Sequence, residues 1–155
     1  MAIAKKRRNA AKWGGGPFVA MPRDFLRSRT LASLSPFAAK LLLDMLAAYN
    51  GRNNGDLCCT WVLMQPRGWR SKSTLEKARR ELLDKGVIQL TRQGGRKWPN
   101  LHALDLFWVD ECKGKQLEVA PSGRPTNRWL LKEPAPSIEE ARAAFKAKQQ
   151  QTAAP

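Results

Sequence analysis

The chain has a single histidine and few carboxylates, which leaves little material for catalysis or metal binding. His102 is the one histidine, and 13 Asp and Glu residues stand against 28 Lys and Arg. Asp105 and Asp110 are too isolated to suggest a two-metal nuclease. The run 14–16 of glycines lacks the following Gly-Lys-Ser/Thr of a phosphate loop. We therefore expect no enzyme, catalytic residue, cofactor or metal site, and we expect His102 to be a packed strand residue.

Cysteines and long apolar runs are also scarce. Cys58, Cys59 and Cys112 are odd in number and lack the spacing of a zinc site or a disulfide scaffold, which favours a reducing compartment. The sequence offers no apolar run of roughly 18 residues and no basic amphipathic helix for a membrane surface. The basic cluster 5–8 is not followed by the apolar core of a signal peptide. These observations predict a cytoplasmic protein, in a bacterial cell or an infected host cell, with no membrane partner.

Positive charge is what the chain has in excess. Its formal net charge is +15. Charge of this size repels itself in a compact fold unless a polyanion lies nearby. Nucleic acid is therefore the leading class of partner.

The 155 residues, 43% of them hydrophobic, suit one globular domain with two tails. Residues 1–16 combine positive charge with glycine and predict a flexible basic arm. Residues 17–110 carry the apolar patterns of a folded domain. Residues 111–155 read as a linker rich in proline and lysine that ends in a C-terminal helix over 137–151. The apolar residues of this tail that we consider for a homodimer are Ile138, Phe145 and the cluster Trp129, Leu130 and Leu131.

Local signals predict two helices and a short strand in the first half of the domain. Ser35 can cap a helix that opens with Pro36 and runs to Tyr49. Its buried stripe is expected to contain Phe37, Ala38, Leu41, Leu42, Met45, Leu46 and Ala48. A short strand at 56–60 and a second helix at 61–65 follow.

A third helix and a hairpin complete the domain. The helix is expected over 72–85, with Ser73 and Glu76 at the spacing of a capping box. Two strand-like runs, 87–92 and 101–108, flank a long, basic, glycine-containing tip. This order of elements is that of an α+β winged helix-turn-helix domain, in which three helices and a short strand form the core and the hairpin forms the wing.

The outward face of the third helix is the main candidate for DNA contact. The residues expected to face inward are Leu75, Ala78 and Leu82. A rotation of about 100° per residue then turns outward Ser73, Lys77, Arg80 and Asp84. Arg80 has the planar fork that pairs with guanine, whereas Lys72 and Lys77 suit phosphates. Arg70 and Ser71, just before the helix, offer donors to a further phosphate.

Charge supports the same region. Between Arg70 and Lys97 there are nine cations and three carboxylates, a net charge of +6. The N-terminal cluster adds an arm that can follow phosphates. The complete set of predicted DNA-binding residues is Lys5, Lys6, Arg7, Arg8, Arg70, Ser71, Lys72, Ser73, Lys77, Arg80, Arg92, Arg96 and Lys97.

Each of these features also has a purely structural interpretation. Glu76 with Arg80, and Lys77 with Glu81, have the spacing of helix surface pairs worth about 0.2 to 0.5 kcal/mol. The basic tip can be a solvated turn, and the basic arm a solubilising tail. Trp98 can stack on a base, but a tryptophan followed by proline more often pins its loop to the core.

From Pro17 to Trp108 the sequence resembles small winged-helix proteins of bacteria, phages and mobile elements, and it is similar to the winged-helix domains of plasmid and phage replication initiators. The segments that carry this resemblance are 34–36, 50–51, 53–57, 68–71, 75–78 and 81–86. It implies a third helix that reads a DNA groove, in a transcriptional regulator or a replication accessory or initiator protein. The chain departs from two-domain initiators in being shorter and in lacking an ATPase module.

Two other functions remain open at this point. A winged helix can serve as a docking module, here on a host or replication protein. RNA binding is the other alternative, although the aromatic stacking motifs of common RNA-binding modules are missing.

Overall fold

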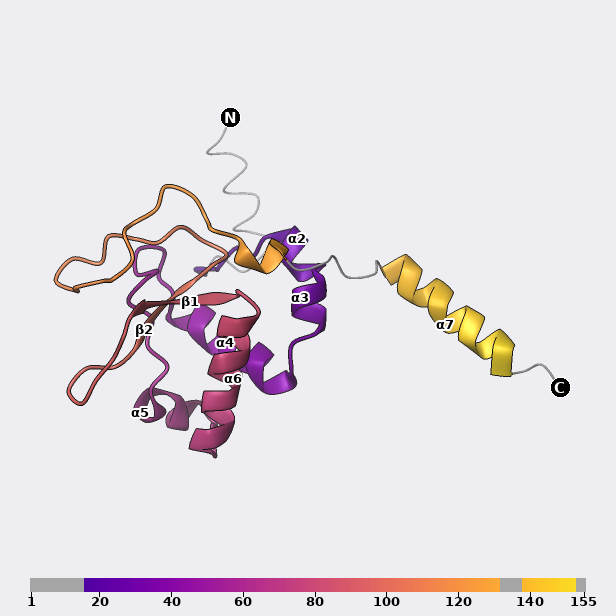
Figure 1. The fold of residues 1–155 in the computed structure, drawn as a ribbon, viewed down its shortest axis with the longest axis horizontal. Helices are drawn as coiled ribbons and strands as arrows, with labels where there is room; N and C mark the ends of the chain where they lie inside the picture. Colours follow the sequence, from indigo (N-terminus) through magenta and orange to yellow (C-terminus); the bar gives the residue numbers. More distant parts are fainter. Residues whose placement is uncertain (1–15, 132–137, 153–155) are drawn as a thin grey trace.

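The computed structural model describes residues 16–131 and 138–152, and these form an α+β fold (Figure 1). The described residues contain three long helices, several short ones and one antiparallel hairpin. In chain order the helices and strands are α2 (Arg23–Leu26), α3 (Arg29–Ala32), α4 (Pro36–Ala48), α5 (Trp61–Met64), the 3-10 helix η1 (Gln65–Arg67), α6 (Lys72–Asp84), β1 (Ile88–Arg92), β2 (Leu101–Leu104), the 3-10 helix η2 (Arg128–Leu131) and α7 (Ile138–Thr152). No helix in the described ranges combines the length and the apolar character needed to cross a bilayer.

Helix α4 begins as the sequence predicts and supplies much of the core. The Ser35 hydroxyl accepts a hydrogen bond from the Ala38 amide at 3.2 Å, which satisfies one of the free amides of the first turn. Five apolar residues are buried: Ala38, Leu41, Leu42, Met45 and Leu46. The prediction that Phe37 and Ala48 belong to the buried stripe is wrong, since both are exposed. Both residues lie on one line of the helix, beside the buried stripe. The Phe37 ring contacts the Trp69 ring there, with centroids 6.2 Å apart.

The predicted strand at 56–60 is reduced to one bridge, between Leu57 and His102. The amide of each residue donates to the carbonyl of the other, at 3.1 and 2.8 Å. The Thr60 carbonyl already accepts from the Met64 amide, so the chain turns into α5 before a strand can extend. The predicted second helix at 61–65 is confirmed as α5, with its end one residue earlier.

Helix α6 packs against α4 and fits its predicted span with a different cap. Leu75, Ala78 and Leu82 are buried, as expected. The prediction of a capping box that starts at Ser73 is wrong, because Ser71 is the N-cap and its hydroxyl accepts from the Thr74 amide at 3.3 Å. Ser73 therefore lies inside the helix, with its side chain in solvent.

The chain leaves α6 through Gly86, which has a φ of +68°. This left-handed conformation favours glycine at the end of a helix. A Cβ at Gly86 would also lie 2.9 Å from the Arg128 Cβ, so space as well as conformation requires glycine.

The hairpin pairs Ile88 with Leu104 and has a register irregularity between Leu90 and Arg92. Its second strand was expected over 101–108 but ends at Leu104. The buried side chain of Asn54 explains this early end. It accepts from the Leu104 amide at 2.7 Å and donates to the carbonyls of Leu104 and Trp108, so it holds a turn where the strand was expected.

The chain beyond residue 110 remains part of the packed body. Trp129 is buried, and its ring meets Phe25 edge-on with centroids 5.1 Å apart. The Arg128 guanidinium pairs with the buried Asp105 at 2.5 Å and donates to the Ile88 carbonyl. The folded region thus extends past the predicted boundary at residue 110, and Trp129 is withdrawn from the surface proposed for a homodimer.

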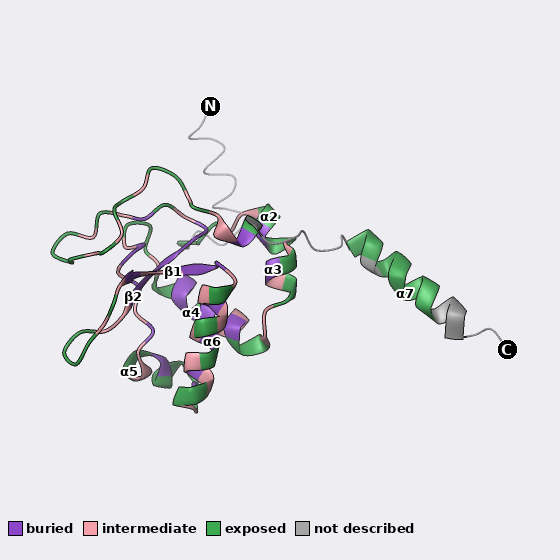
Figure 2. Ribbon diagram, viewed as in Figure 1, coloured by how far each residue is buried: buried purple, intermediate pink, exposed green. Residues whose placement is uncertain are grey.

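Helix α7 confirms the predicted C-terminal helix and stands apart from the rest of the chain (Figure 2). Ile138 and Phe145 are both exposed. Leu130, in η2, is exposed as well.

Candidate nucleic-acid interface

The outward line of α6 lies in solvent, as its period predicts. Ser73, Lys77, Arg80 and Asp84 are all exposed. Burial of the opposite face against α4 fixes the rotation of the helix about its axis. Side chains on the outward line are therefore held on one stripe rather than distributed around the helix.

The start of α6 adds two exposed cations, Arg70 and Lys72. The Lys72 ammonium lies over the Trp61 ring, 5.9 Å from its centroid, and this contact links α6 to α5. The Ser71 hydroxyl is committed to the helix cap and lies 2.9 Å from the Ser73 hydroxyl. Ser71 contributes to the site mainly by fixing the first turn on which its neighbours stand.

Glu76 gathers two arginines of α6. Its carboxylate accepts from Arg79 at 2.6 and 2.8 Å and from the Arg80 Nε at 3.0 Å. The hydrogen bonds from Arg79, more than any other contact, lower the pKa of Glu76 to about 2. The surface pair of Glu76 with Arg80 is thus present, although the Arg80 side chain is still 71% exposed.

The second surface pair, of Lys77 with Glu81, does not form. Glu81 accepts instead from the Ser35 amide at 2.8 Å and the Ser35 hydroxyl at 2.6 Å, and it pairs with Lys85 at 3.3 Å. Because the Glu81 carboxylate is occupied by Ser35 at the start of α4 and by Lys85 at the end of α6, Lys77 is left without an ion pair within the described residues.

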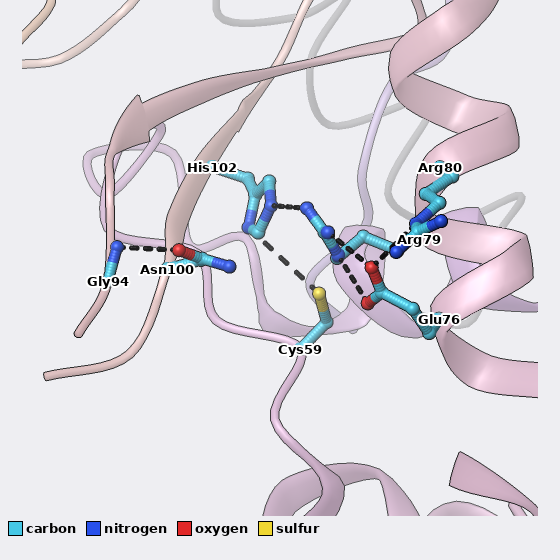
Figure 3. A network of polar contacts seen from close by, with 7 residues as sticks. All are labelled: Cys59, Glu76, Arg79, Arg80, Gly94, Asn100 and His102. Carbon is cyan, nitrogen blue, oxygen red and sulfur yellow. Dashed lines mark hydrogen bonds and ion pairs between the residues drawn. The ribbon is translucent and has the colours of Figure 1, made fainter. Parts of the chain in front are cut away.

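Arg79 connects α6 to the hairpin through His102 (Figure 3). The Arg79 NH1 lies 3.4 Å from the His102 Nε2, and the other ring nitrogen lies 4.0 Å from the Cys59 Sγ. A guanidinium only donates, so Nε2 is the acceptor and the imidazole proton belongs on Nδ1, toward the sulfur. The chain of contacts fixes α6 relative to β2.

Burial decides the chemistry of the pair of Cys59 and His102. It raises the pKa of the Cys59 thiol to about 12, and, with the nearby Arg79 charge, it lowers the pKa of His102 to about 4. Both groups are therefore neutral near pH 7, and the thiol lacks the thiolate character of a nucleophile. His102 is packed in the strand, as expected, with none of its surface exposed.

The hairpin tip, residues 93–100, presents Arg96 and Lys97 to solvent. Arg92, also predicted to contact DNA, is half-buried, and its guanidinium lies 5.7 Å from the Trp98 ring centroid. Trp98 is 67% exposed, so the expectation that it pins the tip to the core is wrong.

A buried acid anchors the turn between α5 and α6, and local patterns did not reveal it. Asp44 of α4 accepts from Lys40 at 2.8 Å, from the Arg67 Nε at 2.8 Å and from the Trp69 Nε1 at 2.7 Å. Burial alone would raise the pKa of Asp44, but these hydrogen bonds outweigh it and hold the pKa below its usual value. In the sequence, the one signal of these contacts was the four-residue spacing of Lys40 and Asp44, which suits an ion pair on a helix.

The structure thus places most of the predicted set on two adjoining elements. Exposed on α6 or just before it are Arg70, Lys72, Ser73, Lys77 and Arg80, and exposed on the hairpin tip are Arg96 and Lys97. Lys5, Lys6, Arg7 and Arg8 lie outside the described residues. In the part of the chain that the structure describes, no three His, Cys, Asp or Glu side chains lie close enough together to hold a metal ion. No family model, curated protein or solved structure matches the chain.

Proposed function

We propose that this chain is a winged helix-turn-helix protein that binds double-stranded DNA. In this proposal α5 and α6 form the helix-turn-helix, α6 enters the major groove, and the hairpin of β1 and β2 is the wing. One observation carries the proposal: the exposed line of α6 bears Lys77 and Arg80, with its apolar face fully occupied by the core. A helix held in this way can present the same side chains to every duplex that it meets.

The contacts of Arg80 suit a residue that exchanges one partner for another. Arg80 donates to Glu76 through Nε, so an end-on pair of its NH1 and NH2 groups with guanine leaves that bond in place, whereas a side-on pair through Nε requires Arg80 to release Glu76. Glu76 would keep both hydrogen bonds from Arg79, so this exchange does not strand a charged carboxylate. Arg70, Lys72, Arg96 and Lys97 would hold phosphates on either side of the base contact.

On the resemblance of its sequence, we place this activity in a phage or mobile-element regulator of transcription or a replication accessory or initiator protein. Its site of action would be the cytoplasm of a bacterial or infected host cell. No catalytic step is part of the proposal.

A second candidate, docking on a host or replication protein, is favoured by exposed apolar side chains. Leu43 on α4 and Val62 and Leu63 on α5 are all exposed. These side chains offer contact area to a protein and little to a polyanion.

A salt titration distinguishes these functions. Binding of the full chain to duplex DNA, duplex RNA and single strands is measured over a range of salt. We expect duplex DNA to bind most tightly, with log affinity falling linearly with log salt by about 0.9 per phosphate contacted. Binding of duplex RNA equal to that of DNA, or no binding of either, would overturn the proposal and favour RNA binding or protein docking.

A pair of matched variants locates the interface. Lys72→Ala with Lys77→Ala should weaken duplex binding and flatten the salt dependence by about two phosphate contacts. Arg23→Ala with Arg27→Ala removes two exposed cations at α2, outside the proposed interface, and should leave the slope unchanged. Equal losses from the two pairs would mean that net charge, and not α6, provides the binding.

A further inference from the structure

The hairpin tip carries an exposed tryptophan on a well-held backbone. Two hydrogen bonds close the tip: the Gly95 amide donates to the Trp98 carbonyl at 2.8 Å, and the Gly94 amide donates to the Asn100 side-chain oxygen at 2.6 Å. A Cβ at Gly94 would lie 2.5 Å from the backbone nitrogen of Asn100, so this close approach requires glycine. The indole is therefore displayed from a defined turn.

The orientation of the ring is also constrained. The Arg92 guanidinium lies 5.7 Å from the Trp98 centroid, and Arg92 in turn donates to the Pro99 carbonyl at 3.4 Å. Despite this contact, two thirds of the Trp98 side chain remains exposed. A large ring that is held in place while most of it stays in solvent is available to stack on a partner.

A groove of about 730 Å³ adjoins the ring. Trp98 and Arg92 line one part of it together with the backbone of Gly94 and Gly95, and residues 114–118 line the other. Its one carboxylate, Glu118, accepts from the Gln93 amide at 3.1 Å. The groove has the size of a small-molecule site, and Gly95, with no atom within 4 Å of its Cβ position, leaves room for a flat group to approach the backbone.

The charges around the tip indicate what such a group is attached to. Arg96 and Lys97 immediately precede the tryptophan and are exposed. Cations beside an aromatic platform are the combination by which proteins hold unpaired nucleotides, with phosphates on the cations and bases on the rings.

We propose that Trp98 is a stacking platform for a nucleobase that has left the helical stack of the DNA bound by α6. This inference rests on the proposed function and adds a ligand class to it: the wing would prefer duplex with a displaced or unpaired base over perfect duplex. Arg92 would back the ring, Arg96 and Lys97 would hold the neighbouring phosphates, and the groove would receive the base.

The test compares two duplexes that differ by one unpaired base, bound by the full chain and its variants. The wild type should prefer the duplex with the unpaired base. Stacking of one base on an aromatic side chain is worth about 1 to 3 kcal/mol, so Trp98→Leu should reduce this preference by roughly 5- to 150-fold and leave perfect-duplex binding nearly unchanged. Trp98→Phe keeps a ring and should retain part of the preference.

Trp108→Leu is the matched control, because Trp108 is also exposed, its Nε1 donates to Asp110 at 3.1 Å, and it does not line the groove. It should behave as the wild type. Thermal melting of each variant checks that the fold is kept.

The outcomes separate the inference from the proposed function. If the wild type binds perfect duplex but shows no preference for the unpaired base, the stacking role is wrong and the proposed DNA binding stands. The same conclusion follows if Trp98→Leu and Trp98→Phe have equal preferences. If Trp98→Leu weakens both duplexes equally, Trp98 is a general contact and the inference is again overturned. If the wild type binds neither duplex, the proposed function fails as well.

Discussion

Helices α4 and α6 have the same length and the same kind of start, but they expose different chemistry. Each has thirteen residues and a serine N-cap whose hydroxyl accepts an amide hydrogen bond. The exposed side of α4 includes the apolar Phe37 and Leu43, whereas that of α6 bears Lys77 and Arg80. Because length and capping are shared, the side chains alone separate the tasks: α4 organises the core, and α6 presents charge from it.

The largest expected effect comes from breaking the α4 side of this comparison. Leu41→Ala should lower the free energy of unfolding by about 2 to 5 kcal/mol, since Leu41 is fully buried and its removal leaves a cavity. Lys77→Ala on α6 should change it by no more than about 0.5 kcal/mol. Urea denaturation measures both. Similar losses for the two variants would contradict the division of tasks.

Asp44 ties α4 to the turn that precedes α6, so its loss should have the next largest effect. Asp44→Ala should cost about 1 to 3 kcal/mol, because the buried Trp69 Nε1 would lose its acceptor. Asp44→Asn keeps an acceptor and should cost less. Urea denaturation of the two variants, followed by duplex binding, checks this order. An Asn variant that is less stable than the Ala variant would show that hydrogen bonding to Trp69 is not the reason.

The smallest expected effect concerns the pH dependence of Glu76. Its pKa of about 2 in the folded chain lies below the usual 4.5, so its stabilising contribution is complete above about pH 4.5 and is lost as the pH falls toward 2. The side chain is 42% exposed, so solvent screens the effect. Urea midpoints between about pH 5 and pH 2.5 should fall more steeply for the wild type than for Glu76→Gln. Parallel pH curves would contradict the assignment.

Features set by neighbours in the sequence were predictable. The start of α4 at Ser35, the inward and outward faces of α6 and the turn at Gly86 all follow from residues within one or two helical turns. The predicted exposure of Lys77 and Arg80 needed only the helical period.

Features set by distant partners were not predictable. Asn54 ends β2 through bonds across 50 residues, and Thr30 donates to the Trp129 carbonyl across 99. Glu81 accepts a hydrogen bond from Ser35, 46 residues away, and forms no pair with Lys77. Periodicity contains no information on such pairs, so it could not predict where β2 ends, that Trp129 is buried or which partners Glu81 takes.

We propose that α6 reads bases while Arg96 and Lys97 of the hairpin tip hold the DNA backbone, and substitution of Arg80 tests this proposal most directly. A preferred duplex is first selected from a random library, and its binding is compared with that of random DNA. Arg80→Ala should cost about 1 to 3 kcal/mol on the preferred duplex and much less on random DNA, whereas Arg96→Ala with Lys97→Ala should weaken both by similar factors. If the Arg80 variant loses preferred and random binding equally, α6 does not read bases through Arg80, and its pairing with Glu76 is only a surface contact.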